Sequence, residues 1–340
     1  MNRLQFGADK PMDFIAVGRL CVDLNANETG RPMEETRTFT KYVGGSPANI
    51  AIGMSRLGAN TGFIGKVSDD QMGRFIVDYL RRNRLDTSQV TTDRTGASTG
   101  LAFTEIKSPT DCSILMYRDN AADLKLSTAD VSEAYVRNAK VMLISGTALA
   151  ASPSREAVFL ALEYARRHDV VAMFDLDYRP YTWKNSDEIG IYYALAAEKC
   201  DVIIGTREEF DLMERFGGGG AGDEATADRW FAHRASIVVI KHGKDGSFAY
   251  TKEGTVHRGK VFPANIVKTF GAGDAYASSF IYGLLQGWSI DKCMEMGSAS
   301  AAIVISSHSC SDALPDRETI ERYIERCNRE EAQEKEGVER

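Results

Sequence analysis

The segment Lys268-Thr269-Phe270-Gly271-Ala272-Gly273-Asp274 directly precedes an apolar stretch, residues 275–285, that predicts a long helix. Gly271, Ala272 and Gly273 are small enough to let a ligand approach the backbone closely at the start of that helix. The free N–H groups and the positive end of the helix dipole favour an anion there. Asp274, just inside this position, is well placed to act as a general base. A glycine turn with an acidic residue that suits the dipole explains the same pattern without any function.

A second glycine turn lies far upstream, at Gly44-Gly45-Ser46-Pro47-Ala48-Asn49. Ser46 followed by Pro47 predicts a helix N-cap and a proline at the first helical position, and Gly58 suits the helix C-terminus. Asn49, on the first turn, offers both a donor and an acceptor to a ligand. The same residues also serve as simple punctuation between a hairpin and a helix, and this segment alone does not decide between the two.

The rest of the chain alternates between short β-branched runs and helical stretches, which predicts an α/β fold with a mostly parallel sheet covered by helices on both faces. The predicted strands are 14–17, 63–67, 141–144, 170–174, 202–204 and 237–240. The predicted helices are 47–57, 72–83, 155–168, 189–199, 208–216 and 224–233. Two segments with strand character, 21–42 and 98–117, break the alternation, and we expect them to pair as a small antiparallel sheet that projects from the core.

Composition excludes several classes of protein without choosing a function. The chain has 340 residues and a net charge of −7, which disfavours binding to nucleic acid. Mean hydropathy is −0.27, and no apolar run reaches the roughly 20 residues of a membrane helix. The N-terminal residues contain no signal-peptide core. Six cysteines are scattered singly, which predicts reduced thiols and a cytoplasmic protein: Cys21, Cys112, Cys200, Cys293, Cys310 and Cys327.

Two glycine-rich segments resemble nucleotide-binding motifs but lack the required context. Residues 217–222 read GGGGAG and suggest a dehydrogenase, yet they follow a predicted helix where a dinucleotide loop must follow a strand. Residues 254–260 resemble a P-loop, but Val261 stands where a hydroxyl is needed, and the flanks predict a hairpin. The five histidines show no paired spacing, so a zinc site is not expected.

The two glycine turns, in this order and roughly 225 residues apart, make the chain similar to the ribokinase-like (PfkB) carbohydrate kinases, from Phe14 to about Tyr323. The resemblance implies a three-layer α/β/α fold, ATP and Mg²⁺ as cofactors, and a β lid over the sugar. The implied core comprises residues 13–20, 43–97 and 118–325, and the implied lid 21–42 and 98–117. Residues 326–340 form a charged C-terminal tail. Pairing of lids between subunits in the family implies a possible homodimer.

The resemblance also implies a role for individual residues. Asp274 matches the family's catalytic base, which takes a proton from the sugar hydroxyl as it attacks the γ-phosphate of ATP. The anion hole for the transferred phosphoryl group matches Gly271, Ala272 and Gly273. The sugar-binding positions match Asp23, Gly44, Gly45 and Asn49. The nucleotide-binding positions match Thr206, Lys241, Gly243, Gly246 and Lys268. Glu209 matches a residue that organises Mg²⁺ through water.

Two further segments narrow the implied substrate to a sugar acid. Residues 175–183, DLDYRPYTW, and 117–122, YRDNAA, resemble family branches that phosphorylate keto-deoxy sugar acids. Arg179 and Arg118 can each clamp a carboxylate through parallel hydrogen bonds, although either arginine could instead pair internally with Asp175 or Asp177. Residues 308–315, HSCSDALP, together with 205–209 and 267–271, resemble the family branch that acts on 5-dehydro-2-deoxygluconate in myo-inositol breakdown. The resemblance implies that substrate, with 2-keto-3-deoxygluconate as the alternative.

The chain departs from the family pattern at Ser68, Thr206, Asp177 and Lys268. In many relatives the residue at position 268 is an aspartate that helps to hold a monovalent cation. We expect the Lys268 ammonium to supply that positive charge here, so that no monovalent cation is required. A non-catalytic sugar or nucleotide sensor with the same fold is the alternative from another class, although the intact GAGD segment disfavours it.

Overall fold

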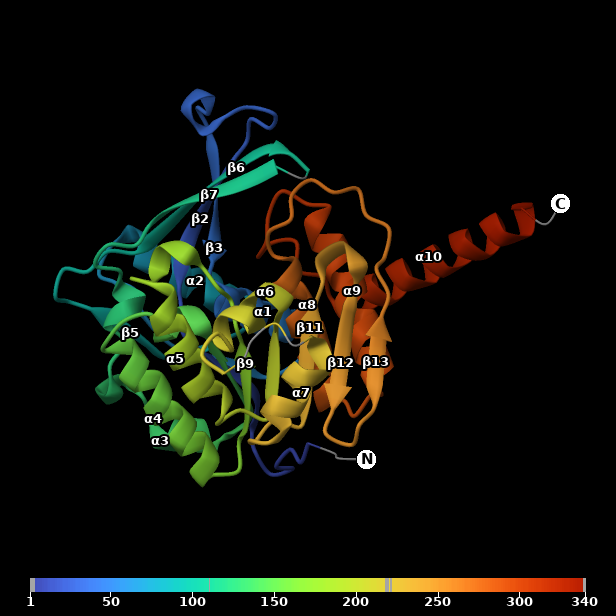
Figure 1. Cartoon of the computed structure of the whole chain (residues 1–340). Helices are drawn as coiled ribbons and strands as arrows, with labels where there is room; N and C mark the ends of the chain where they lie inside the picture. The colour runs from blue at the N-terminus through green and yellow to red at the C-terminus, as the bar shows by residue number, and fades with distance from the viewer. Residues whose placement is uncertain (1–3, 110, 218–219, 221, 339–340) are drawn as a thin grey trace.

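The computed structural model describes residues 4–109, 111–217, 220 and 222–338, which form a large sheet covered by helices and a small sheet standing above it (Figure 1). The expected α/β class, with a mostly parallel sheet and a small second sheet, is confirmed. The hairpin expected around residues 254–260 is also present, between β12 and β13. The segment 217–222 falls partly outside the described residues.

The large sheet has nine strands in the described part of the chain, and its central strands are parallel. From one edge to the other they are β13 (Val256–Gly259), β12 (Ser247–Thr251), β11 (Ile237–Lys241), β10 (Val202–Thr206), β9 (Val171–Asp175), β8 (Ala139–Ser145), β1 (Met12–Val17), β4 (Thr61–Ser68) and β5 (Asp86–Asp93). β12 runs in the opposite direction to the other strands, so its pairings with β11 and β13 are both antiparallel. Sequence analysis missed β5 because its residues, DTSQVTTD, are almost all polar.

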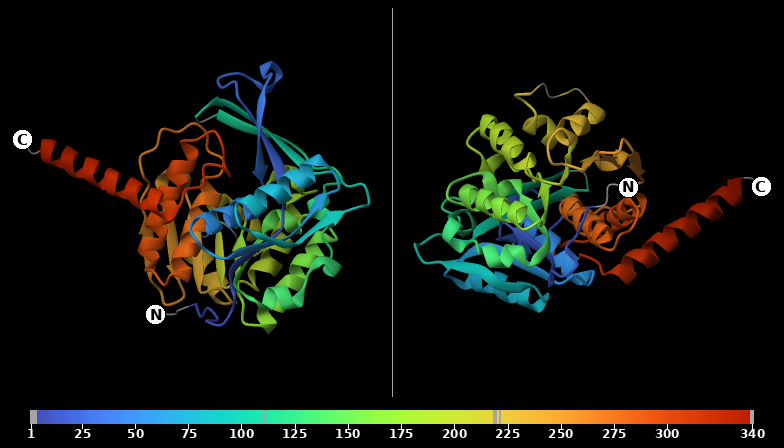
Figure 2. Two further views of the ribbon diagram at one scale, coloured as in Figure 1. Left: turned by 180° about the vertical axis from the view of Figure 1, so that it is seen from behind. Right: turned by 90° about the horizontal axis from the view of Figure 1, so that it is seen from below.

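Side chains of the buried strands alternate between two hydrophobic cores, one on each face of the sheet. In β1, Phe14 and Ala16 join one core, while Ile15 and Val17 join the other. The first core is closed by α1 (Ser46–Arg56), α2 (Gln71–Arg82), α8 (Ala272–Leu285), α9 (Ile290–Ile305) and the start of α10 (Arg317–Val338). The second is closed by α3 (Glu133–Arg137), α4 (Ser154–Arg167), α5 (Ser186–Ala197), α6 (Arg207–Met213) and α7 (Asp223–Phe231). Figure 2 shows both layers and the end of α10 extending away from the body.

The small sheet has the strand order β3 (Phe39–Gly44), β2 (Cys21–Ala26), β6 (Gly100–Ser108), β7 (Asp111–Tyr117). The expectation of an antiparallel sheet is wrong for its central pair, because β2 and β6 are parallel. β2 follows β1 and β6 follows β5, and both of those strands leave the same edge of the large parallel sheet. The two segments therefore run in the same direction, and each adds an outer antiparallel strand.

Most helices lie where the sequence analysis expects them, but α3 and α9 were not predicted, and α5 and α8 each begin three residues earlier than expected. The start of α1 also differs. Gly45, with φ +107°, is the N-cap, and Ser46 is the first helical residue. The predicted capping role of Ser46 is therefore wrong, because its hydroxyl is bonded elsewhere. Gly58 follows the helix with φ +102°, as predicted. Short 3-10 turns occur at η1 (Met33–Glu35), η2 (Ala122–Lys125), η3 (Thr128–Asp130), η4 (Gly146–Leu149), η5 (Pro180–Thr182) and η6 (Gly243–Asp245).

Within the described ranges, none of the helices has the length and apolar character needed to span a bilayer. All six cysteines are free thiols, and all but Cys112 are buried.

Candidate active site

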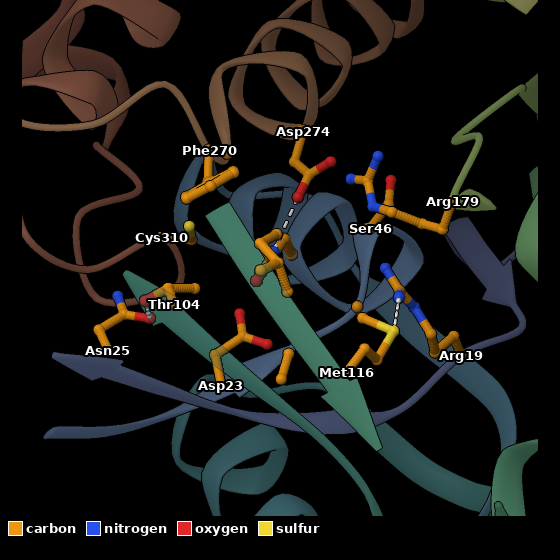
Figure 3. A pocket seen from close by; sticks show the side chains of 15 residues that line it. Arg19, Asp23, Asn25, Ser46, Thr104, Met116, Arg179, Phe270, Asp274 and Cys310 are labelled. Atoms are coloured by element: carbon orange, nitrogen blue, oxygen red, sulfur yellow. Dashed lines mark hydrogen bonds between the residues drawn. The ribbon is translucent and has the colours of Figure 1, made fainter. Parts of the chain in front are cut away.

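A cavity lies between the small sheet and the carboxyl ends of the parallel strands, where open α/β sheets bind ligands (Figure 3). Its lining comes from the small sheet, the β1–β2 connection and the starts of α1 and α8. The lining residues are Arg19, Asp23, Asn25, Gly45, Ser46, Asn49, Ala102, Thr104, Ile114, Met116, Arg179, Phe270, Gly271, Asp274 and Cys310.

Asp274 lies in the first turn of α8 and points into this cavity (Figure 3). The N-cap of the helix is Gly271, whose φ of +83° lies in the left-handed region. A Cβ on Gly271 would also come within 2.9 Å of Cys310 Sγ, so only glycine fits without strain. This turn leaves the first backbone N–H groups of the helix, those of Ala272 and Gly273 among them, free to bind an anion beside the carboxylate.

The glycine turn of α1 meets Asp274 across the cavity. Asn49 Nδ2 donates a 2.7 Å hydrogen bond to Asp274 Oδ2, which joins residues 225 positions apart. Gly45 needs its positive φ, and a Cβ there would lie 2.5 Å from the carbonyl oxygen of Arg19. A Cβ on Gly44 would overlap the carboxylate of Asp23. Gly44 therefore leaves room for the Asp23 carboxylate, and Gly45 leaves room for the backbone of Arg19.

Asp23, on β2, lies opposite Asp274 in Figure 3. Burial raises the pKa of this carboxyl to about 6, although the neighbouring Arg19 acts in the opposite direction. A carboxyl in this state can exchange hydrogen bonds with sugar hydroxyls as donor or acceptor. Asn25, two residues further along β2, is held by Thr104 Oγ1 at 2.7 Å and by the carbonyl of His308 at 2.7 Å.

Two arginines share one buried carboxylate at the side of the cavity. Arg179 NH2 lies 2.9 Å from Asp177 Oδ1, and Arg19 NH2 lies 3.5 Å from Asp177 Oδ2. Ser145 and Thr147 donate further hydrogen bonds to Asp177 Oδ2. Burial opposes ionisation of Asp177, but the two guanidinium groups outweigh it and lower the pKa. Arg179 therefore pairs internally with Asp177 and also lines the cavity, and its contact with the substrate stays a prediction.

Arg118 is not among the residues that line the cavity. Its NH2 pairs with Asp123, and both side chains are buried. Its predicted contact with the substrate stays a prediction.

On the other side of Asp274, Lys241 at the end of β11 faces the start of α8. Its Nζ lies 3.9 Å from Asp175 Oδ1 and would be 3.2 Å from a Cβ on Gly273. Asp175 Oδ2 also accepts a 2.5 Å hydrogen bond from Ser46 Oγ. Burial raises the pKa of Asp175 to about 7, with Lys241 opposing the shift. Asp175 thus connects the start of α1 with the lysine beside the anion hole.

Glu209 forms a capping box with Thr206 at the start of α6. Its Oε2 accepts a hydrogen bond from the N–H of Thr206, and its Oε1 one from the N–H of Tyr178. Each carboxylate oxygen keeps a lone pair for water, which fits an indirect role toward Mg²⁺. Across the ranges the structure describes, no cluster of three or more His, Cys, Asp or Glu side chains could ligate a metal directly.

Lys268 is fully buried in the loop before α8. Its Nζ donates a 2.6 Å hydrogen bond to the carbonyl of Phe270 and lies 3.4 Å from Cys310 Sγ. The loop after β11 contains Gly243 and Gly246, with φ values of +58° and +91°. Both glycines are needed for that tight turn, which follows Lys241 directly.

Sequence analysis missed several lining residues, above all Arg19, Ser46, Phe270 and Cys310. Phe270 lies within the recognised glycine segment, and Ser46 within the other, so both could have been included. Arg19 carries no sequence signal, because its role depends on Asp177 and Met116 from distant segments.

Comparison with known proteins gives this arrangement a context. Residues 13–317 match the family described as pfkB family carbohydrate kinase. A 5-dehydro-2-deoxygluconokinase of Geobacillus thermodenitrificans is 72% identical over 325 residues, covering 96% of both chains. A fructokinase from Xylella fastidiosa with bound ATP superposes with a TM-score of 0.80 at 23% identity, covering 92% of this chain and 98% of its own. An E. coli relative in complex with ATP and Mg²⁺ has a TM-score of 0.83 at 21% identity, covering 93% and 99%.

The last two likenesses show the fold alone, whereas the family match spans most of the chain. The expected resemblance is confirmed, and the chain belongs to the pfkB family of carbohydrate kinases.

Proposed function

We propose that the protein transfers the γ-phosphoryl group of ATP to the terminal hydroxyl of 5-dehydro-2-deoxygluconate, giving the 6-phosphate, in the breakdown of myo-inositol. The observation that carries the proposal is the position of Asp274 at the N-terminus of α8, facing a cavity that also holds Asp23 and two arginines. The name of the 72% identical relative supports this substrate. The cavity chemistry supports it too, because a sugar acid presents hydroxyls and a carboxylate.

The residues of the site divide the reaction among them. Asp274 Oδ accepts the proton of the terminal hydroxyl, and Asn49 holds that carboxylate by a 2.7 Å hydrogen bond. The N–H groups of Gly271, Ala272 and Gly273 stabilise the charge that develops on the phosphoryl oxygens, with Lys241 beside them. Asp23, which lies against Gly44, binds sugar hydroxyls together with the turn at Gly44 and Gly45.

On the nucleotide side, Thr206, Gly243 and Gly246 border the polyphosphate of ATP. Mg²⁺, when bound, neutralises part of the phosphate charge, and Glu209 would hold it through water. Lys268 supplies a fixed positive charge where relatives bind a monovalent cation, because its ammonium already donates to the Phe270 carbonyl. No monovalent cation is therefore required.

We also propose that the small sheet acts as a lid and pairs with a second copy of the chain. Its outer face carries Leu101, Phe103, Leu115 and Tyr117 on adjacent strands, and the last two are 49% and 60% exposed. Contiguous exposed apolar side chains of this kind mark interaction surfaces. The free thiols support a reducing compartment, the cytoplasm.

The test is ADP release with ATP and Mg²⁺ over a panel of 5-dehydro-2-deoxygluconate, 2-keto-3-deoxygluconate, ribose, fructose and adenosine. We expect preference for the first, and Asp274→Asn lowering kcat by roughly 10²–10⁴-fold while ATP still binds. Preference for 2-keto-3-deoxygluconate would change the assigned substrate to that sugar acid and leave the proposed mechanism unchanged. Activity on neutral sugars alone, or on none of the panel, would refute the proposal, and the last result would favour a sensor.

A further inference from the structure

Arg19 is a buried cation with poor internal partners. Its side chain is only 4% exposed, yet it lines the cavity. NH2 reaches Asp177 at 3.5 Å, NH1 has only the sulfur of Met116 at 3.8 Å, and Nε has no hydrogen-bond partner among the described residues. Thioether sulfur is a weak acceptor, and a buried unpaired charged donor carries a large desolvation cost. The geometry therefore leaves donors available for an anion inside the cavity.

Asp177, the carboxylate that Arg19 contacts, already has other partners. Asp177 is paired with Arg179 at the shorter distance of 2.9 Å and also accepts hydrogen bonds from Ser145 and Thr147. Two guanidinium groups thus share the Asp177 carboxylate, and Arg179 has the shorter contact with it. The other buried arginine nearby, Arg118, has its own partner in Asp123.

The two arginines of the cluster face different parts of the cavity. In Figure 3, Arg179 lies on the side of Ser46 and Asp274, whereas Arg19 lies on the side of Met116. Arg19 also contacts Met116 of β7, in the small sheet. In the proposed substrate, the reacting hydroxyl and the carboxylate are at opposite ends of a six-carbon chain. With the hydroxyl at Asp274, the carboxylate would lie away from Asp274, and Arg19 lines the cavity beside Met116 of the small sheet (Figure 3).

We propose that Arg19 binds the substrate carboxylate and determines the preference for a sugar acid over a neutral sugar. This inference rests on the proposed function and assigns to Arg19 the role that sequence analysis gave to Arg118 and Arg179. A guanidinium and a carboxylate form two parallel hydrogen bonds, so the substrate would satisfy the donors that Met116 serves poorly.

The experiment compares 5-dehydro-2-deoxygluconate with its primary amide, which keeps the terminal hydroxyl and removes the charge. For Arg19→Gln we expect kcat/KM to fall roughly 10²–10³-fold on the acid and less than about 3-fold on the amide. Asp177 keeps Arg179 in this variant, so no carboxylate is left unpaired. Arg19→Lys, which retains the charge without the fork, should lose about 10-fold on the acid.

Arg155→Gln is the control, because Arg155 is also largely buried but is not among the residues that line the cavity, and it bonds the carbonyls of Leu149 and Ala150. It should leave the acid-to-amide ratio unchanged. If Arg19→Gln lowers kcat/KM equally on acid and amide, so that the acid-to-amide ratio is unchanged, the role of Arg19 is overturned while the proposed function stands. If Arg19→Gln does not fold, the ratio in Arg19→Lys decides in the same way. If the wild-type protein phosphorylates only neutral sugars, the proposed function itself fails.

Discussion

Gly271→Ala tests whether the start of α8 must keep its present geometry. The new methyl group would sit on a backbone with φ +83° and come within 2.9 Å of Cys310 Sγ and 3.2 Å of Val304 Cγ1. The left-handed backbone costs about 1–2 kcal/mol for a residue with a Cβ. Crowding against the buried thiol adds about 1–3 kcal/mol if the neighbours do not move. We expect the free energy of unfolding to fall by about 2–5 kcal/mol.

The activity should fall further than the stability suggests. Relief of the contact requires the turn to shift away from Cys310, and this turn carries the N–H groups beside Asp274. A displacement of the order of 1 Å at such a position costs about 10²-fold in rate. We therefore expect kcat to fall roughly 10²-fold, with little change in KM for the sugar.

Two companion variants separate backbone strain from crowding. Gly58→Ala introduces the same kind of strain, at φ +102°, with no atom within 4 Å of the new methyl group. It should cost about 1–2 kcal/mol of stability and leave kcat unchanged. The double variant Gly271→Ala/Cys310→Ala removes the thiol and should recover about 1 kcal/mol and part of kcat relative to Gly271→Ala alone. Urea unfolding measures the free energy of unfolding, and ADP release measures kcat.

The reasoning would be refuted by a Gly271→Ala protein whose kcat stays within 3-fold of wild type. It would also be refuted if removing the Cys310 thiol restored neither stability nor rate.

Other outcomes follow from the same structure. The activity of the wild type should be unchanged when K⁺ replaces a bulky organic cation in the assay. Lys268→Ala should lower kcat at least 10-fold, because the buried ammonium is lost. Strong activation of the wild type by K⁺ would contradict the role given to Lys268. Because burial raises the pKa of Asp23 from 3.8 to about 6, the folded state keeps a proton that the unfolded chain releases. The free energy of unfolding should therefore fall as pH rises from about 4 to 6, by up to about 3 kcal/mol from this group. Urea unfolding measured at several pH values should show a weaker dependence of that free energy on pH in Asp23→Asn than in the wild type. Leu115→Glu on the outer face of the small sheet should convert a dimer to a monomer in sedimentation velocity; a wild-type monomer would refute the lid pairing.

Local patterns predicted most of the large sheet and its helices. Strands such as 141–144 and 237–240 are buried on both faces and read as uninterrupted apolar runs, which periodicity detects. The edge strand β5 escaped detection because its polar residues carry no such pattern. The direction of β6 relative to β2 was missed for a different reason: it depends on where two distant segments leave the large sheet.

The candidate active site likewise combines features that local sequence predicts with features that depend on distant segments. By itself the sequence determined the two glycine turns, Asp274 and Asn49, because turn geometry and helix-start chemistry depend on neighbouring residues. Only the tertiary structure decided that Lys268 is fully buried against the Phe270 carbonyl and that Ser46 bonds Asp175 instead of capping its helix. It also placed Arg118 with Asp123 and brought Arg19 into the cavity. These contacts join residues from separate strands and loops, so their energies depend on burial and charge that no local pattern records.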